Sequence, residues 1–132
     1  MAKYVFPAVF TPEENGMYSV DFPDLEGCYT CGEDLVEAID MAEDALALML
    51  YEYEKDGRPI PSPSPRSGFS LSGDEFVNLI SCDTLSYQKR NNKKSVKKTL
   101  SIPEWLNEAA VSAEVNFSQV LQEALIDKLH LA

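Results

Sequence analysis

The first third of the chain alternates between hydrophobic and polar positions as β-strands do. Residues 3–11 are rich in β-branched and aromatic side chains, and residues 17–22 alternate along both sides of the backbone. An Asn-Gly pair between them tolerates positive φ, so the two runs are predicted to form a hairpin. Residues 28–31 can add a short third strand. Because Pro7 has no N–H group, it favours an edge position or a bulge for the first strand.

A long amphipathic helix is predicted to follow. Asp34 is expected to cap it, Glu37 completes a capping-box pattern, and Gly57 is expected to end it. Its apolar stripe recurs at steps of three and four: Leu35, Ala38, Ile39, Ala42, Leu46, Met49 and Tyr53. The positions between them are mostly acidic, so the outer face of this helix is expected to carry negative charge.

Three segments after the helix divide the chain. Residues 58–68 contain four prolines and are expected to form a stiff connection, while residues 75–82 are predicted to be a fourth strand. Residues 83–94 are polar and lack an apolar period. They are therefore interpreted as a linker between a domain of residues 1–82 and a domain of residues 95–132.

The C-terminal domain is predicted to be strand–helix–helix. Residues 95–102 alternate, Pro103 favours the first turn of a helix, and Ser118 can cap a second helix. A lone strand has no partner, and the domain is too small for a full core of its own. Both deficits disappear if two copies pair their strands antiparallel and interlock their helices. The predicted core of this dimer is Leu100, Ile102, Trp105 and Leu121.

Charge is also distributed unevenly along the chain, and the balance changes after residue 88. Residues 1–88 hold 17 acidic and 4 basic residues, a net charge of −13, whereas residues 89–132 hold 7 basic and 5 acidic residues, a net charge of +2. A phosphate backbone is repelled by the first part and attracted by the second. The alternative is that both runs are only solvated faces. Six basic residues lie in one stretch without an acid: Lys89, Arg90, Lys93, Lys94, Lys97 and Lys98.

The basic stretch and the predicted strand overlap, which favours DNA binding. A two-stranded ribbon fits the major groove, and the start of the second helix, at Asn116 and Ser118, offers amide groups to a phosphate. The alternative is a protein-interaction dimer with no DNA role. The residues expected to contact DNA are Lys94, Lys97, Thr99, Ser101, Asn116 and Ser118.

The sequence KKTLSIPEWLNEAA…NFSQVLQEAL resembles the ribbon-helix-helix domain of bacterial repressors. In that family alternate strand residues read bases, which the resemblance assigns to Lys97, Thr99 and Ser101. Lys98 departs from the pattern, because an inward apolar residue is usual at its position. The departure leaves open where the buried part of the ribbon begins.

Residues 3–82 resemble the HicB antitoxin family. The resemblance lies in Pro23-Asp24-Leu25 followed by Gly27, in Gly32 leading into the helix, and in the run Asp56 to Pro61. It implies an α+β fold in which a small antiparallel sheet packs on one helix in the order β-β-β-α-β, a partial RNase H fold. It also implies a partner toxin of the HicA type, a small basic RNase with a double-stranded-RNA-binding-like fold.

The acidic first domain is electrostatically complementary to such a partner, because a protein that grips RNA presents positive charge. Asp24 and Glu26 are the predicted toxin contacts, with the acidic helix face as a further candidate. For any one of these residues the alternative is an ordinary solvated acidic surface.

Enzymatic and metal-binding interpretations are not favoured. RNase H-type chemistry needs several carboxylates around divalent metal ions, typically with one on the first strand, and KYVFPAVF has no acid. Cys28 and Cys31 would point to opposite faces of a strand, and Cys82 and His130 are too distant to complete a zinc site. The cysteines are interpreted as structural thiols and His130 as an exposed helix-end residue. No catalytic residue, metal or cofactor is predicted.

We therefore expect an antitoxin that occludes a HicA-type mRNA-cleaving RNase and represses its own operon. It would be a homodimer or a larger assembly in the bacterial cytoplasm, since no export signal or apolar run of roughly 20 residues is present. The alternative is a stand-alone dimeric ribbon-helix-helix transcription factor whose N-terminal domain serves sensing or oligomerisation.

Overall fold

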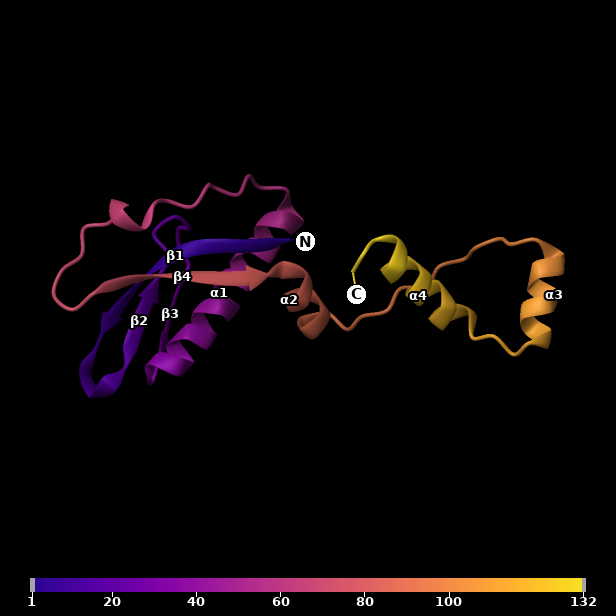
Figure 1. Ribbon diagram of the computed structural model, residues 1–132, viewed down its shortest axis with the longest axis horizontal. Helices are drawn as coiled ribbons and strands as arrows, with labels where there is room; N and C mark the ends of the chain where they lie inside the picture. Colours follow the sequence, from indigo (N-terminus) through magenta and orange to yellow (C-terminus); the bar gives the residue numbers. More distant parts are fainter. Residues whose placement is uncertain (1, 132) are drawn as a thin grey trace. The chain divides into compact units, whose positions relative to one another are not determined.

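The computed structural model describes residues 2–131 and divides into two compact units, residues 1–94 and residues 95–132 (Figure 1). We call them the first and the second unit. The first contains a sheet and two helices, and the second contains two further helices. This is the predicted α+β class, with the predicted β-β-β-α-β order at the start of the chain.

The sheet of the first unit has four antiparallel strands in the order β3-β2-β1-β4. A 3₁₀ turn at Glu14–Gly16 (η1) joins β1 to β2, and Asn15 and Gly16 have the positive φ values, 64° and 79°, that the Asn-Gly pair predicted. A second 3₁₀ turn, η2, lies at Arg66–Gly68 in the connection from α1 to β4. The strands are β1 (Lys3–Pro12), β2 (Tyr18–Asp21), β3 (Tyr29–Gly32) and β4 (Phe76–Asp83).

Helix α1 (Leu35–Asp56) begins and ends where its capping residues predicted. The Asp34 carboxylate accepts a hydrogen bond from the Glu37 N–H at 2.8 Å. The Glu37 carboxylate accepts one from the Glu33 N–H at 3.1 Å, one residue before the position expected in a capping box. Gly57 ends the helix with φ 67°, a left-handed conformation that glycine adopts without strain.

The core lies between α1 and one face of the sheet. Alternate residues of β1, namely Phe6, Ala8 and Phe10, are buried there. Complete burial of a phenylalanine or leucine side chain contributes about 1.5–3 kcal/mol each. The other buried apolar residues are Pro7, Val20, Phe22, Leu25, Cys28, Ala38, Ala42, Leu46, Ala47, Leu50 and Ile80.

The end of β3 approaches α1 so closely that only glycine fits. A Cβ atom on Gly32 would lie 2.3 Å from the Ala38 nitrogen and 2.6 Å from the Ala38 Cα. Both atoms belong to the helix backbone and cannot rotate away. The absence of a side chain at Gly32 therefore sets the distance between sheet and helix at this point.

Pro7 lies in an inner strand, which corrects the expectation that it marks an edge strand or a bulge. The Glu13 N–H donates to the Met17 carbonyl, so the odd-numbered residues of β1 direct their backbone groups toward β2. However, β2 pairs only with residues 9–12 of β1, and β4 pairs with residues 3–10. The missing N–H of Pro7 therefore falls on the side where β2 has already ended, and no β1–β4 bond is lost.

A helix that the sequence did not predict, α2 (Thr84–Asn91), occupies most of the segment interpreted as a linker. The Asp83 carboxylate caps it, accepting bonds from Leu85 N–H at 3.0 Å and Ser86 N–H at 3.4 Å. The Tyr87 ring packs against the Tyr51 ring of α1, with 5.7 Å between centroids. The helix thus belongs to the first unit. Eight residues are too short for an apolar period to show in the sequence.

The second unit contains α3 (Glu104–Ser112) and α4 (Phe117–Lys128). Pro103 immediately precedes α3. The cap of α4 is Asn116, whose side chain accepts from the Gln119 N–H at 3.1 Å, and not Ser118 as predicted. Residues 95–102 form no strand in the single chain, since a strand needs a neighbour to pair with.

Replacing Gly32 with alanine should destabilise the first unit by about 1–3 kcal/mol, because the new methyl group overlaps the backbone of α1. Urea unfolding followed by near-ultraviolet circular dichroism reports mainly on this unit, since all six tyrosines lie in it and Trp105 is the only other contributor of comparable absorbance. Gly68→Ala is the matched control. A Cβ there would meet nothing closer than 3.9 Å, so equal losses in both variants would contradict the close approach.

Candidate partner-binding and nucleic-acid-binding surfaces

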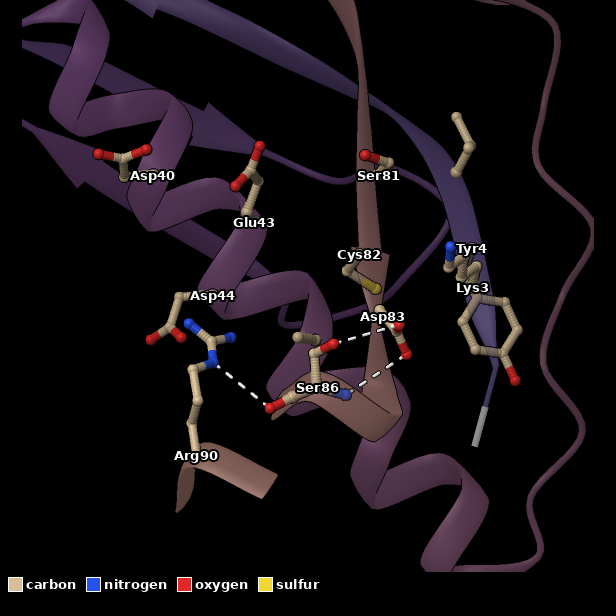
Figure 2. Close-up of a pocket in the computed structure, with 12 residues that line it drawn as sticks. Lys3, Tyr4, Asp40, Glu43, Asp44, Ser81, Cys82, Asp83, Ser86 and Arg90 are labelled. Atoms are coloured by element: carbon tan, nitrogen blue, oxygen red, sulfur yellow. Dashed lines mark hydrogen bonds between the residues drawn. The ribbon is translucent and has the colours of Figure 1, made fainter. Parts of the chain in front are cut away.

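The first unit has a cleft of about 600 Å³ where α1, α2, the end of β4 and the start of β1 meet. Figure 2 shows Asp40, Glu43 and Asp44 along α1, across from the end of β4, with Arg90 extending from α2. The other residues that line the cleft are Lys3, Tyr4, Val5, Ala47, Ser81, Cys82, Asp83 and Ser86.

The carboxylates of this cleft fall into two groups. Asp83 accepts hydrogen bonds from Ser86 and Leu85 of α2. Burial raises the pKa of Asp83, but these bonds outweigh burial, and the pKa lies below its ordinary value. Asp40, Glu43 and Asp44 are exposed, and among residues 2–131 no group donates a hydrogen bond to them or forms an ion pair with them. The α1 wall of the cleft is therefore negatively charged and forms no ion pair, although Lys3 and Arg90 also line the cleft.

A partly buried polar cluster joins the elements that surround the cleft. Thr84 is completely buried, and its hydroxyl donates to the Glu54 carboxylate at 3.1 Å, while the Tyr4 hydroxyl donates to the same oxygen at 2.8 Å. Burial and the bond to Glu54 raise the pKa of Tyr4 to about 12. The Thr84 N–H also donates to the Ala2 carbonyl at 3.0 Å. These bonds connect the start of β1, α1 and the start of α2.

The loop after β2 contains the two predicted toxin contacts, and they have different surroundings. Asp24 is half-buried, and its carboxylate accepts bonds from both the Ser64 N–H, at 2.9 Å, and the Ser64 hydroxyl. It thereby holds the proline-rich connection against the loop. Glu26 is exposed at the surface. Of the two, Glu26 is the side chain available to a partner without a local rearrangement.

The cysteines do not form a shared site. Cys28 is buried and Cys31 is exposed, as their spacing on opposite faces predicted. Burial, together with the nearby Asp83, raises the pKa of the half-buried Cys82 thiol to about 12, and burial raises that of Cys28 to about 11. Within residues 2–131, no group of three or more His, Cys, Asp or Glu residues could hold a metal ion.

In the second unit, the residues expected to meet DNA are all exposed. Lys97, Thr99 and Ser101 lie in the segment without regular structure before α3, and Lys94 lies just ahead of it. Asn116 caps α4 through its side chain, and the Ser118 hydroxyl, in the first turn, accepts a bond from Gln122. The single chain does not bring these groups into one binding face.

No residue from 95 to 131 is buried. Of the predicted dimer core, Trp105 is 70% exposed, Leu100 57% and Ile102 46%, while Leu121 is half-buried. Exposed apolar surface on this scale is typical of surfaces that pack against a partner. The other exposed apolar residues of this unit are Val96, Leu106, Val111, Phe117, Val120, Leu125, Ile126 and Leu129.

The first unit is acidic and has a core of its own, whereas no residue from 95 to 131 of the second unit is buried. Residues 6–125 match the family of "HicB_like antitoxin of bacterial toxin-antitoxin system". The chain therefore belongs to the HicB-like antitoxin family. This is a family of antitoxins, which agrees with the prediction that the chain is not an enzyme.

Individual relatives support the same assignment. The chain is 36% identical over 74 residues to antitoxin HicB of Escherichia coli strain K12, and 40% identical over 74 residues to antitoxin HicB 1 of Photorhabdus laumondii. The aligned part is 56% of this chain in both comparisons. It spans only 51% and 44% of the respective relatives, about half of their length.

Solved structures share the fold. A toxin–antitoxin complex from Streptococcus pneumoniae contains a chain with 27% identity and a TM-score of 0.62, and the match covers 96% of this chain and 99% of that one. Antitoxin HicB of Burkholderia pseudomallei matches with 19% identity and a TM-score of 0.53, over 100% and 99% of the two chains. The second likeness concerns the fold alone.

The cleft and the helix α2 beside it are the features that sequence reasoning missed. One signal was available: Asp83 stands three residues before Ser86, in a sequence that can cap a helix.

No helix of the described residues is long and apolar enough to span a bilayer.

Proposed function

We propose that the protein is an antitoxin that binds and occludes a HicA-type mRNA-cleaving RNase and represses its own operon in the bacterial cytoplasm. The main support for this proposal is the division of the chain into two units with different properties. The first unit is folded and mostly acidic. The basic stretch of residues 89–98 leads from it into the second unit, in which no residue from 95 to 131 is buried. The two units therefore suit different partners.

The acidic unit is the proposed toxin-binding part. Three carboxylates of its cleft have no cationic partner among residues 2–131, and Glu26 is exposed on the loop after β2. An RNase that binds RNA presents positive charge, so the two surfaces attract. We propose Glu26 as a direct contact and Asp24 as the residue that holds its loop in place. Covering the face that binds RNA would exclude the substrate.

The second unit is the proposed operator-binding part. Two copies would pair residues 95–102 as an antiparallel ribbon, which would bury Leu100 and Ile102 together with Trp105 and Leu121 of the helices. Lys97, Thr99 and Ser101 would then project from the outer side of the ribbon toward the bases. Lys94 and the start of α4, with Asn116 and Ser118, would contact phosphates.

Co-expression with the neighbouring gene tests the proposed binding and inhibition of the toxin. If that gene encodes a small basic RNase, the two proteins should co-purify, and the purified chain should abolish RNA cleavage at equimolar amounts. A chain that binds its operator but neither binds nor inhibits the product of that gene would instead favour a stand-alone transcription factor.

Leu100→Asp should leave the chain monomeric and its second unit unfolded, because dimerisation would bury two unpaired charges near the dyad. Operator binding should be lost while toxin binding through the first unit remains. Analytical ultracentrifugation and tryptophan fluorescence give the readout, since Trp105 is the only tryptophan. Ser101→Asp is the control: its charge faces outward, so the dimer should persist. A folded monomeric second unit in Leu100→Asp would refute the ribbon.

Thr99→Ala should weaken binding to operator DNA by about 1–3 kcal/mol if Thr99 reads a base, and leave non-specific DNA binding nearly unchanged. Titrations of the fragment upstream of the operon and of a scrambled fragment, at one salt concentration, measure both. Lys94→Ala should weaken the two equally, because a phosphate contact carries no sequence information. Equal losses on both fragments for Thr99→Ala would mean that Thr99 also touches only phosphate.

A further inference from the structure

The free edge of β4 combines an unpaired backbone with the acidic cleft. β4 lies at one end of the strand order and pairs only with β1. One hydrogen bond shows which residues of β4 bond to β1. The Thr84 N–H donates to the Ala2 carbonyl, one pair beyond the pairing of Lys3 with Asp83. Even-numbered residues of β4 therefore bond β1, and Val77, Leu79 and Ser81 direct their N–H and C=O groups to the free edge.

Among residues 2–131, no strand pairs with the outer side of β4. Within the same range, no group forms a hydrogen bond with the outward backbone groups of Val77, Leu79 or Ser81. Leu79 is 48% exposed and Ser81 is exposed as well. Proteins usually protect an edge strand with charge, proline or a covering segment. Residues 77–81 contain neither a charged residue nor a proline.

The acidic cleft lies at one end of the free edge of β4. Ser81 and Cys82, at the carboxyl end of β4, line the cleft, and the carboxylates of Asp40, Glu43 and Asp44 stand opposite them (Figure 2). A strand laid along residues 77–81 would therefore continue past these carboxylates. Its side chains at that end would be stabilised if they were cationic.

We propose that the free edge of β4 accepts a β-strand from the toxin, with cationic side chains of that strand in the acidic cleft. This rests on the proposed function and names the surface that performs it, in addition to the loop of Glu26. A second copy of this chain fits less well. Each first unit carries 17 acidic and 8 basic residues, so two such units repel each other. Strand addition of this kind takes its affinity from backbone bonds and its specificity from side chains.

Ser81→Pro tests the backbone contribution. The proline removes an N–H that β1 does not use, so the sheet should remain folded by circular dichroism, while the affinity for the toxin should fall by about tenfold. The probe is the catalytically inactive product of the neighbouring gene, measured by calorimetry with the full chain. Ser81→Ala loses the same hydroxyl but keeps the N–H, and it should bind like the wild type.

Glu43→Gln tests the charge of the cleft. It should weaken toxin binding several-fold at low salt and make the affinity less dependent on salt, since exposed charges act through a screened field. Glu14→Gln makes the same chemical change in the hairpin turn, beyond the opposite end of the sheet, and should have no effect. Equal effects of the two variants would mean that only net charge matters, which would overturn the cleft as a site.

Amide hydrogen exchange of the wild-type chain provides a readout that needs no variant. In the free protein Asn78 and Ile80 should be protected, while Val77, Leu79 and Ser81 exchange faster. In the toxin complex these three should become protected too. If the toxin binds without protecting them, the edge assignment is wrong and the proposed function stands. If the toxin does not bind the wild-type chain at all, the proposed function itself fails. Loss of self-association in Ser81→Pro, with toxin affinity intact, would assign the edge to a second copy.

Discussion

The alternation of β1 is the constraint on which the rest of the first unit depends. Its even-numbered residues place Phe6, Ala8 and Phe10 against α1 and bond β4 through their backbone. Its odd-numbered residues direct their backbone groups to the side of β2, which pairs with residues 9–12. A slip of one residue would expose the phenylalanines and would also bring Pro7 into the β1–β4 ladder, where its missing N–H would cost a bond. The side chains and the proline therefore specify the same register independently.

Most of this fold could be predicted from local signals, because each element is bounded by residues whose preference does not depend on distant parts of the chain. The Asn15-Gly16 turn and the caps of α1 at Asp34 and Gly57 are examples. Pro7 was misread for a physical reason. Whether a position is an edge depends on the length of the neighbouring strand, and the early end of β2 is a property of the sheet and not of Pro7.

The candidate surfaces were less predictable than the fold. The acidic face of α1 follows from periodicity, but the cleft needs α2, whose position depends on the contact of Tyr87 with Tyr51 and on the burial of Thr84. Asp24 was predicted as a toxin contact because it is acidic and lies in a loop. Its bonds to Ser64 link two segments 40 residues apart, and no local pattern contains that information.

The lack of a single buried residue between 95 and 131 also has a consequence for the cell. If this unit folds only on pairing, the amount of DNA-binding species follows the square of the chain concentration while most chains are unpaired. Halving the number of chains would then reduce that species fourfold, whereas toxin neutralisation by the self-sufficient first unit would fall only twofold. Repression would be released before neutralisation failed, so that synthesis resumes while the existing toxin is still held.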